Sequence, residues 1–158
     1  MKQTSRARKM PGLALGMALL ADAVTLPAFA ALGGDAASVD ADVVKMKAQA
    51  RATPVAGYSV SEMTLPGGTV VREYVSAEGK VFAVTWKGLT VPNLQQTLGG
   101  YFEEYKAAAA ATARAGHHHL SIQHTDLVVN TGGHMRAWKG VAYARSLLPP
   151  NFSLDEIQ

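Results

Sequence analysis

The chain has 158 residues, a formal net charge of +3 and no cysteine. Residues 1–30 hold four of the 15 basic residues and one of the 12 acidic ones, so eleven of each remain after them. A basic surplus usually points to nucleic acid or an anionic membrane surface, but here it belongs to the first 30 residues. The lack of cysteine excludes thiol catalysis, thiolate metal sites, disulfides and lipid attachment to a cysteine.

Residues 1–30 have the pattern of a cleavable secretory signal peptide. A basic segment, residues 2–9, precedes an apolar stretch, residues 13–26, which Asp22 interrupts. Small residues at Ala28 and Ala30 suit a signal peptidase, so we expect cleavage after Ala30. The apolar stretch falls short of the about 20 apolar residues that a permanent anchor needs. The sequence therefore predicts a periplasmic or secreted protein with no transmembrane segment after cleavage.

Residues 31–158 are predicted to form one domain, with a flexible N-terminus at residues 31–37. Ser38 is a capping residue, and apolar side chains recur at helical spacing over residues 39–51, before Thr53-Pro54 ends the helix. Three strand-like runs follow, separated by short glycine-containing turns that predict an antiparallel meander. The runs cover residues 58–65, 69–76 and 81–86.

A second helix is predicted after Pro92, because an apolar stripe extends over residues 94–112. Gly99-Gly100 in this helix predicts a close approach to the sheet or to the other helix. Two strands, at residues 120–129 and 134–144 with a turn at 130–133, and a flexible tail at 149–158 complete the chain. The order α-β-β-β-α-β-β indicates an α+β domain: a twisted antiparallel sheet of about five strands with two helices packed on it.

The five histidines suggest a metal site. His117, His118 and His119 lie just after the predicted helix, and imidazole is a common ligand for Zn, Cu and Ni. The alternative is a solvated polar loop. With a turn at Thr131-Gly132, Val129 would pair with His134 and His124 would lie opposite Lys139. His124 and His134 would then be about 16 Å apart along the strands, too far to share a site.

His124 and Asp126 are two residues apart on a predicted strand, where they would share a face. A carboxylate beside a histidine can orient it for acid–base catalysis. The alternative is a polar patch on the sheet, and a bulge near Thr125 would separate the two side chains. Because the sequence has no nucleophile elbow, phosphate-binding loop, dinucleotide-binding glycine motif or zinc-protease motif, it assigns no catalytic residue and no cofactor.

The aromatic and acidic residues of the second helix have simpler interpretations. Tyr101, Phe102 and Tyr105 recur at helical spacing and are expected in the core. Arg72-Glu73 and Glu103-Glu104 are expected on solvated faces. Glu103 and Glu104 diverge by about 100° on a helix and so do not form a paired carboxylate site.

Several segments resemble a family of small exported bacterial proteins that is catalogued only as a domain of unknown function. They are Ala31-Leu32-Gly33-Gly34, residues 68–75, residues 81–86 and Asp126-Leu127-Val128-Val129. The resemblance covers nearly all of residues 31–158 and implies export and a single domain. It implies no activity and carries over no functional residue, and the three consecutive histidines are not part of it.

Together these observations predict an exported, non-enzymatic binding module of the cell envelope. Its partner would be an unknown envelope protein, a peptide or a small ligand, and not nucleic acid. Two alternatives stay open. One is a metal-binding protein that uses His117, His118 and His119, and the other is a cofactor-free hydrolase that uses His124 and Asp126.

Overall fold

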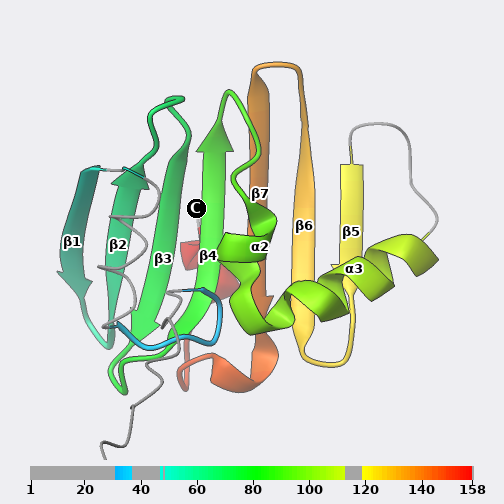
Figure 1. Ribbon diagram of the computed structural model, residues 1–158. Coiled ribbons are helices and arrows are strands. Elements are labelled where there is room, and N and C mark those ends of the chain that lie inside the picture. The colour runs from blue at the N-terminus through cyan, green and yellow to red at the C-terminus, as the bar shows by residue number, and fades with distance from the viewer. Residues whose placement is uncertain (1–30, 37–46, 48, 113–118, 158) are drawn as a thin grey trace, which may run out of the picture.

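One antiparallel sheet of seven strands, in the order β1-β2-β3-β4-β7-β6-β5, organises the molecule (Figure 1). The computed structural model describes residues 31–36, 47, 49–112 and 119–157. The strands are β1 (Gln49–Val55), β2 (Tyr58–Thr64), β3 (Val70–Ser76), β4 (Val81–Gly88), β5 (His119–Gln123), β6 (Leu127–His134) and β7 (Ala137–Ala144). All six neighbouring pairs are antiparallel. Short turns join five of these pairs, for which antiparallel pairing is the expected geometry, whereas β4 and β7 are far apart in the chain.

A helical segment crosses one side of the sheet, which we call the helix face (Figure 1). It consists of α2 (Leu94–Leu98), η1 (Gly99–Tyr101) and α3 (Phe102–Ala111). Asn93 caps α2, because its side chain accepts a hydrogen bond from the backbone N–H of Gln96. Gly99 has a φ of 49°, and a Cβ there would overlap the methyl group of Ala31. The close approach that was predicted to the sheet or to the other helix is instead made by Gly99 alone, to the N-terminal segment.

The predicted fold of about five strands and two helices is wrong, and β1 is the first reason. Residues 49–51, the end of the helix predicted at 39–51, belong to this strand, while residues 39–46 and 48 lie outside the described residues. Pro54 was interpreted as a helix terminator, but an edge strand tolerates its missing N–H. Every residue of β1 is exposed. The strand therefore lacks the apolar alternation that would have distinguished it from a helix end.

The second reason is that the strand predicted at residues 120–129 is divided into β5 and β6. The backbone N–H of His124 donates to the carbonyl of Leu127 at 2.9 Å, which closes a turn between them. The turn predicted at residues 130–133 instead lies within β6, and the chain reverses at Met135-Arg136. Gly133 is required in the strand because a Cβ there would overlap the carbonyl of Ala137.

The main core lies between the helical segment and the sheet. Its buried side chains include Leu32, Met63, Trp86, Leu98, Ile122 and Leu127. Leu32 is 1% exposed, and its backbone N–H donates to the carbonyl of Thr97 at 3.1 Å. Ala31 is likewise buried, so these two residues of the N-terminus that was expected to be loose are packed against the fold.

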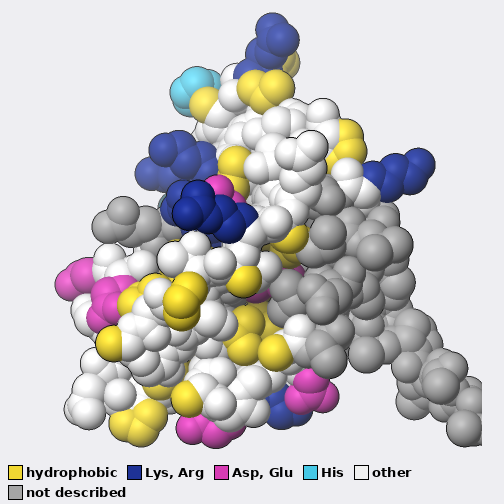
Figure 2. Space-filling model, turned by 90° about the vertical axis from the view of Figure 1, so that its left-hand side faces the viewer, with side chains coloured by type: hydrophobic (Ala, Val, Ile, Leu, Met, Phe, Trp, Pro, Cys, Tyr) yellow, Lys and Arg dark blue, Asp and Glu magenta, His cyan; other side chains and the backbone are white. Residues whose placement is uncertain are grey.

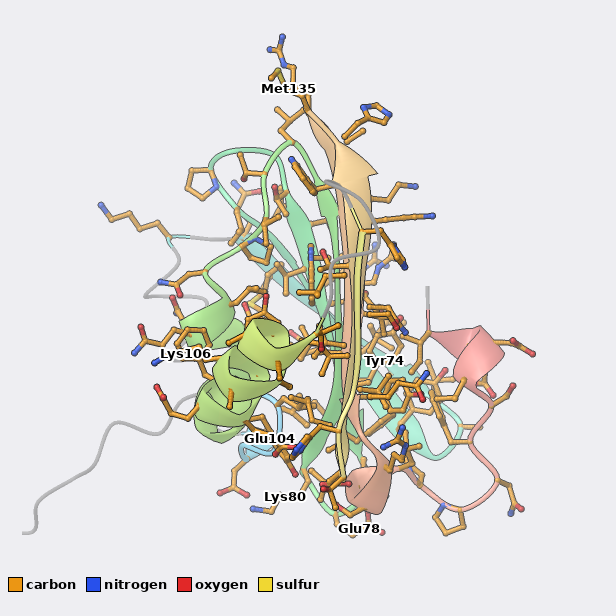
Figure 3. All side chains as sticks on the ribbon, turned by 90° about the vertical axis from the view of Figure 1, so that its right-hand side faces the viewer. Tyr74, Glu78, Lys80, Glu104, Lys106 and Met135 are labelled. Atoms are coloured by element: carbon orange, nitrogen blue, oxygen red, sulfur yellow. The ribbon has the colours of Figure 1, made fainter. Side chains whose placement is uncertain are left out.

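The opposite side of the sheet, the open face, is half covered by the C-terminal segment, residues 145–157. This segment contains η2 (Arg145–Leu147) and η3 (Leu154–Glu156), and the Ser153 side chain caps η3 by accepting a hydrogen bond from the backbone N–H of Asp155. Its Phe152 lies edge-on against Phe82 with ring centroids 4.8 Å apart, and against Tyr58 at 5.3 Å. Figure 3 shows the two layers: the helix on one side of the sheet, and Tyr74 with the C-terminal segment on the other.

Candidate functional site

A pocket of about 550 Å³ lies on the part of the open face that the C-terminal segment leaves uncovered. Its charged lining residues are Glu62, Arg72, Lys87 and Lys139, and its polar ones include His119 and Asn130. They come from six different strands, so the continuous sheet is what brings them together. Ile157 of the C-terminal segment forms part of the lining.

The strand register arranges these side chains in two neighbouring rows across the sheet. The first row runs from Glu62 through Arg72, Thr85, Val141 and Asn130 to Ser121. The second row runs from Val70 through Lys87, Lys139 and Gly132 to His119. Successive members of a row are opposite each other on adjacent strands, so their side chains leave the same side of the sheet.

The pocket has more positive than negative charge. Arg72 Nε donates to Glu62 Oε2 at 2.7 Å, so the acidic residue of the lining is already paired. Lys87 and Lys139 are directly opposite each other on β4 and β7, and both are exposed. Within the described residues neither lysine forms an ion pair. Like charges in this position destabilise a sheet, which makes the lysine pair the unusual feature of the site.

Sequence reasoning did not identify this pocket. It placed Lys139 opposite His124, whereas the structure places Lys139 opposite Gly132 on one side and Lys87 on the other. The error follows from the misplaced turn in β6, since a shift in register changes every cross-strand neighbour. Nothing in the local sequence indicates that β4 pairs with β7, and this pairing is what brings the lysines together.

Only one of the three histidines predicted as metal ligands lies within the described residues. His117 and His118 lie outside them. His119 begins β5, is exposed, and lies at the end of the second row of the pocket. Within the described ranges, no three histidine, aspartate or glutamate side chains are grouped as a metal site would need.

His124 and Asp126 lie in the turn between β5 and β6 and have separate partners. His124 Nδ1 is 2.7 Å from Glu104 Oε1 on α3. Asp126 accepts hydrogen bonds from the backbone N–H and hydroxyl of Ser146, both at 2.7 Å, and from the Tyr101 hydroxyl at 2.9 Å. Because the predicted strand is a turn here, the carboxylate does not contact the imidazole, and the two do not form the expected acid–base pair.

Asp126 is instead the centre of a cluster that joins the helix, a turn and the C-terminal segment. Burial by itself would raise the pKa of Asp126, but the hydrogen bonds from Ser146 and Tyr101 and the charge of Arg145 together lower it. Burial, followed by the hydrogen bond to the Asp126 carboxylate, raises the pKa of Tyr101. Both shifts favour the state in which Asp126 is ionised and Tyr101 is protonated, so the cluster stabilises the fold.

Two further predictions concern side chains on the helix face. Glu73 was expected on a solvated surface but is fully buried there, whereas its neighbour Arg72 points to the open face. Successive side chains of a strand point to opposite faces of the sheet, so neighbouring residues such as Arg72 and Glu73 lie on different faces. Tyr101, Phe102 and Tyr105 pack against the main core, as their spacing predicted.

These features define a small, mostly β domain: one antiparallel sheet covered by a helix on one face, with a basic pocket on the other. The family described as "Protein of unknown function (DUF2844)" matches residues 28–157, and the chain belongs to this family. The resemblance expected from the sequence is thereby confirmed. No curated protein and no solved structure matches the chain. No helix among the described residues is long and apolar enough to cross a membrane.

Proposed function

We propose that the protein is an exported, non-enzymatic binding module of the cell envelope that holds its ligand in the pocket of the open face. The observation that carries this proposal is the pocket itself, about 550 Å³ in volume, beside the part of the sheet face on which the C-terminal segment packs. Its volume is within the range of about 300–1,000 Å³ that is common for ligand sites. The sheet fixes the backbone positions of the lining residues before any ligand arrives, which lowers the entropic cost of binding.

Export is part of the proposal and has separate support. The family match begins at residue 28, next to the predicted cleavage site after Ala30. The chain enters the packed core directly afterwards, at Ala31 and Leu32. Cleavage after Ala30 would thus remove the segment before the domain and leave the contacts of Ala31 and Leu32 in place.

The proposal predicts crosslinking that depends on the face of the molecule. A photoreactive amino acid is placed at Val141, in the pocket, and in a second variant at Ala107, an exposed position on α3. Both variants are produced with residues 1–30 in place, and the cells are then irradiated. We expect a discrete crosslinked product from the Val141 variant that the Ala107 variant does not give.

Intact mass of the same samples tests export. We expect the mass of residues 31–158, and a full-length mass would contradict cleavage after Ala30. Equal crosslinking from both positions, or none from Val141, would contradict the assignment of the open face as the binding surface.

A further inference from the structure

We propose that the pocket binds an extended acidic peptide segment of a partner protein, and that Lys87 and Lys139 bind its carboxylates. This inference rests on the proposed function, because it assigns a ligand class to the same pocket. The chemistry is a pair of charge-assisted hydrogen bonds from ammonium groups to carboxylates, which are roughly twice as strong as bonds between neutral groups.

The arrangement of the two lysines is the first argument. Side chains directly opposite each other on antiparallel strands have Cβ atoms about 5 Å apart. Lys87 and Lys139 are such a pair, and the acidic residue of the pocket, Glu62, is held by Arg72 at 2.7 Å. A carboxylate between the two ammonium groups would replace their repulsion by two attractive interactions. Figure 2 shows lysine and arginine side chains close together in the upper part of the molecule, seen from the β1 edge.

The C-terminal segment supplies the second argument, because it is a peptide segment with a carboxylate that lies on this face next to the pocket. Glu156 accepts a hydrogen bond from the Tyr58 hydroxyl at 2.9 Å, and the next residue, Ile157, lines the pocket. An acidic stretch of the protein's own chain therefore already lies on the open face and reaches the edge of the pocket. A second acidic segment would extend this arrangement across the uncovered strands.

The shape of the pocket is the third argument. Its lining extends from β2 to β5, which are five strand spacings apart. At about 4.8 Å per spacing this is roughly 24 Å, the length of about seven extended residues. Gly132, beside Lys139, has no side chain to interrupt this path. Asn130 Oδ1 accepts from the Ser121 hydroxyl at 2.6 Å, which leaves the amide hydrogens of Asn130 to donate to a bound peptide.

The test measures binding of a fluorescein-labelled, capped hexaglutamate to the mature protein by fluorescence polarisation at low salt. We expect saturable binding, at least tenfold weaker binding to the K87Q/K139Q double variant, and unchanged binding to the K106Q variant. Lys106 is the matched control because it lies on α3, on the other face, paired with Glu103. Hexaglutamine and hexalysine of the same length are expected not to bind.

The opposite results would overturn the inference. The first is that hexaglutamate does not bind, and the second is that the double variant binds it as well as the wild type does. The third is that succinate or phosphate displaces hexaglutamate at an equal concentration of carboxylate or phosphate groups. This third result would indicate a site for small anions. The crosslinking at Val141 separates the two proposals. A Val141 product that persists when hexaglutamate fails to bind would leave the binding module standing and remove the acidic peptide.

Discussion

Replacing Gly140 by alanine is expected to lower the free energy of unfolding by about 3 kcal/mol. Gly140 is opposite Trp86 on the neighbouring strand, and a Cβ at position 140 would overlap the indole ring. Trp86 is 2% exposed and is enclosed by the main core, so the ring has little room to move away. Overpacking of a dense core typically costs about 1–3 kcal/mol, and a collision between a backbone-fixed methyl group and a large ring belongs at the upper end. Urea denaturation followed by tryptophan fluorescence measures the loss.

Gly100→Ala is the matched control for this substitution. Gly100 lies in the helical segment, has no positive φ, and a Cβ there would meet nothing within 4 Å. Alanine at such a position restricts the unfolded chain, so we expect a gain of up to about 1 kcal/mol. Equal losses in the two variants would show that the indole contact does not determine the effect.

Asp126→Asn is expected to destabilise the protein by about 2–3 kcal/mol at neutral pH. The carboxylate accepts three hydrogen bonds, two from Ser146 and one from Tyr101, and an amide nitrogen would face one or more of these donors. Hydrogen bonds to a charged group each contribute about 1.5–3 kcal/mol, and the partial exposure of Asp126 reduces their sum. Thermal and urea denaturation at pH 7 measure the effect.

The pH dependence of this variant gives an independent check. Because the pKa of Asp126 is lowered in the folded protein, its contribution to stability is present above the ordinary value of 3.8 and is lost as the pH falls through the folded value. The difference in stability between wild type and Asp126→Asn should therefore shrink below about pH 4. A difference that stays constant from pH 7 to pH 3 would show that the charge of Asp126 does not contribute.

Glu104→Gln is the control for a carboxylate outside the cluster. Glu104 contacts His124, which is half exposed, and exposed pairs of this kind contribute about 0–1 kcal/mol. We expect a correspondingly small loss of stability at pH 7. A loss as large as that of Asp126→Asn would mean that the His124–Glu104 contact is as important for the fold as the Asp126 cluster.

Local sequence signals were sufficient for the central strands and the helix. β2, β3 and β4 follow the predicted ranges closely because β-branched residues alternate between glycine-containing turns. The strand β1 was missed because its seven exposed residues carry no apolar pattern. The turn was wrongly predicted at residues 130–133 because a glycine pair is typical of turns. In the structure Gly132-Gly133 lies within β6, where the lack of a side chain at Gly133 allows the neighbouring strand to approach closely.

The candidate site was less accessible to sequence reasoning than the fold. His124 and Asp126 are close in sequence, and a shared strand face would have made them a pair, but a turn directs them to different partners. Lys87 and Lys139 are far apart in sequence and meet only through the pairing of β4 with β7. A pocket of this kind depends on long-range strand order, which the composition of a single segment does not encode.

The strand order also has a consequence for how the protein reaches its folded state. Short turns connect β1 to β4 and, separately, β5 to β7, while Ala83–Gly88 pairs with Trp138–Tyr143 across a long connection. Closing that connection costs more chain entropy than closing any of the turns, so we expect two hairpin-built halves to form first and to join last along this seam. Both tryptophans, Trp86 and Trp138, lie at the seam. A refolding phase of tryptophan fluorescence that precedes strand formation, measured by circular dichroism, would contradict this order. Lys87 belongs to one half and Lys139 to the other, so the ability to bind a ligand would arise only in the final step of folding.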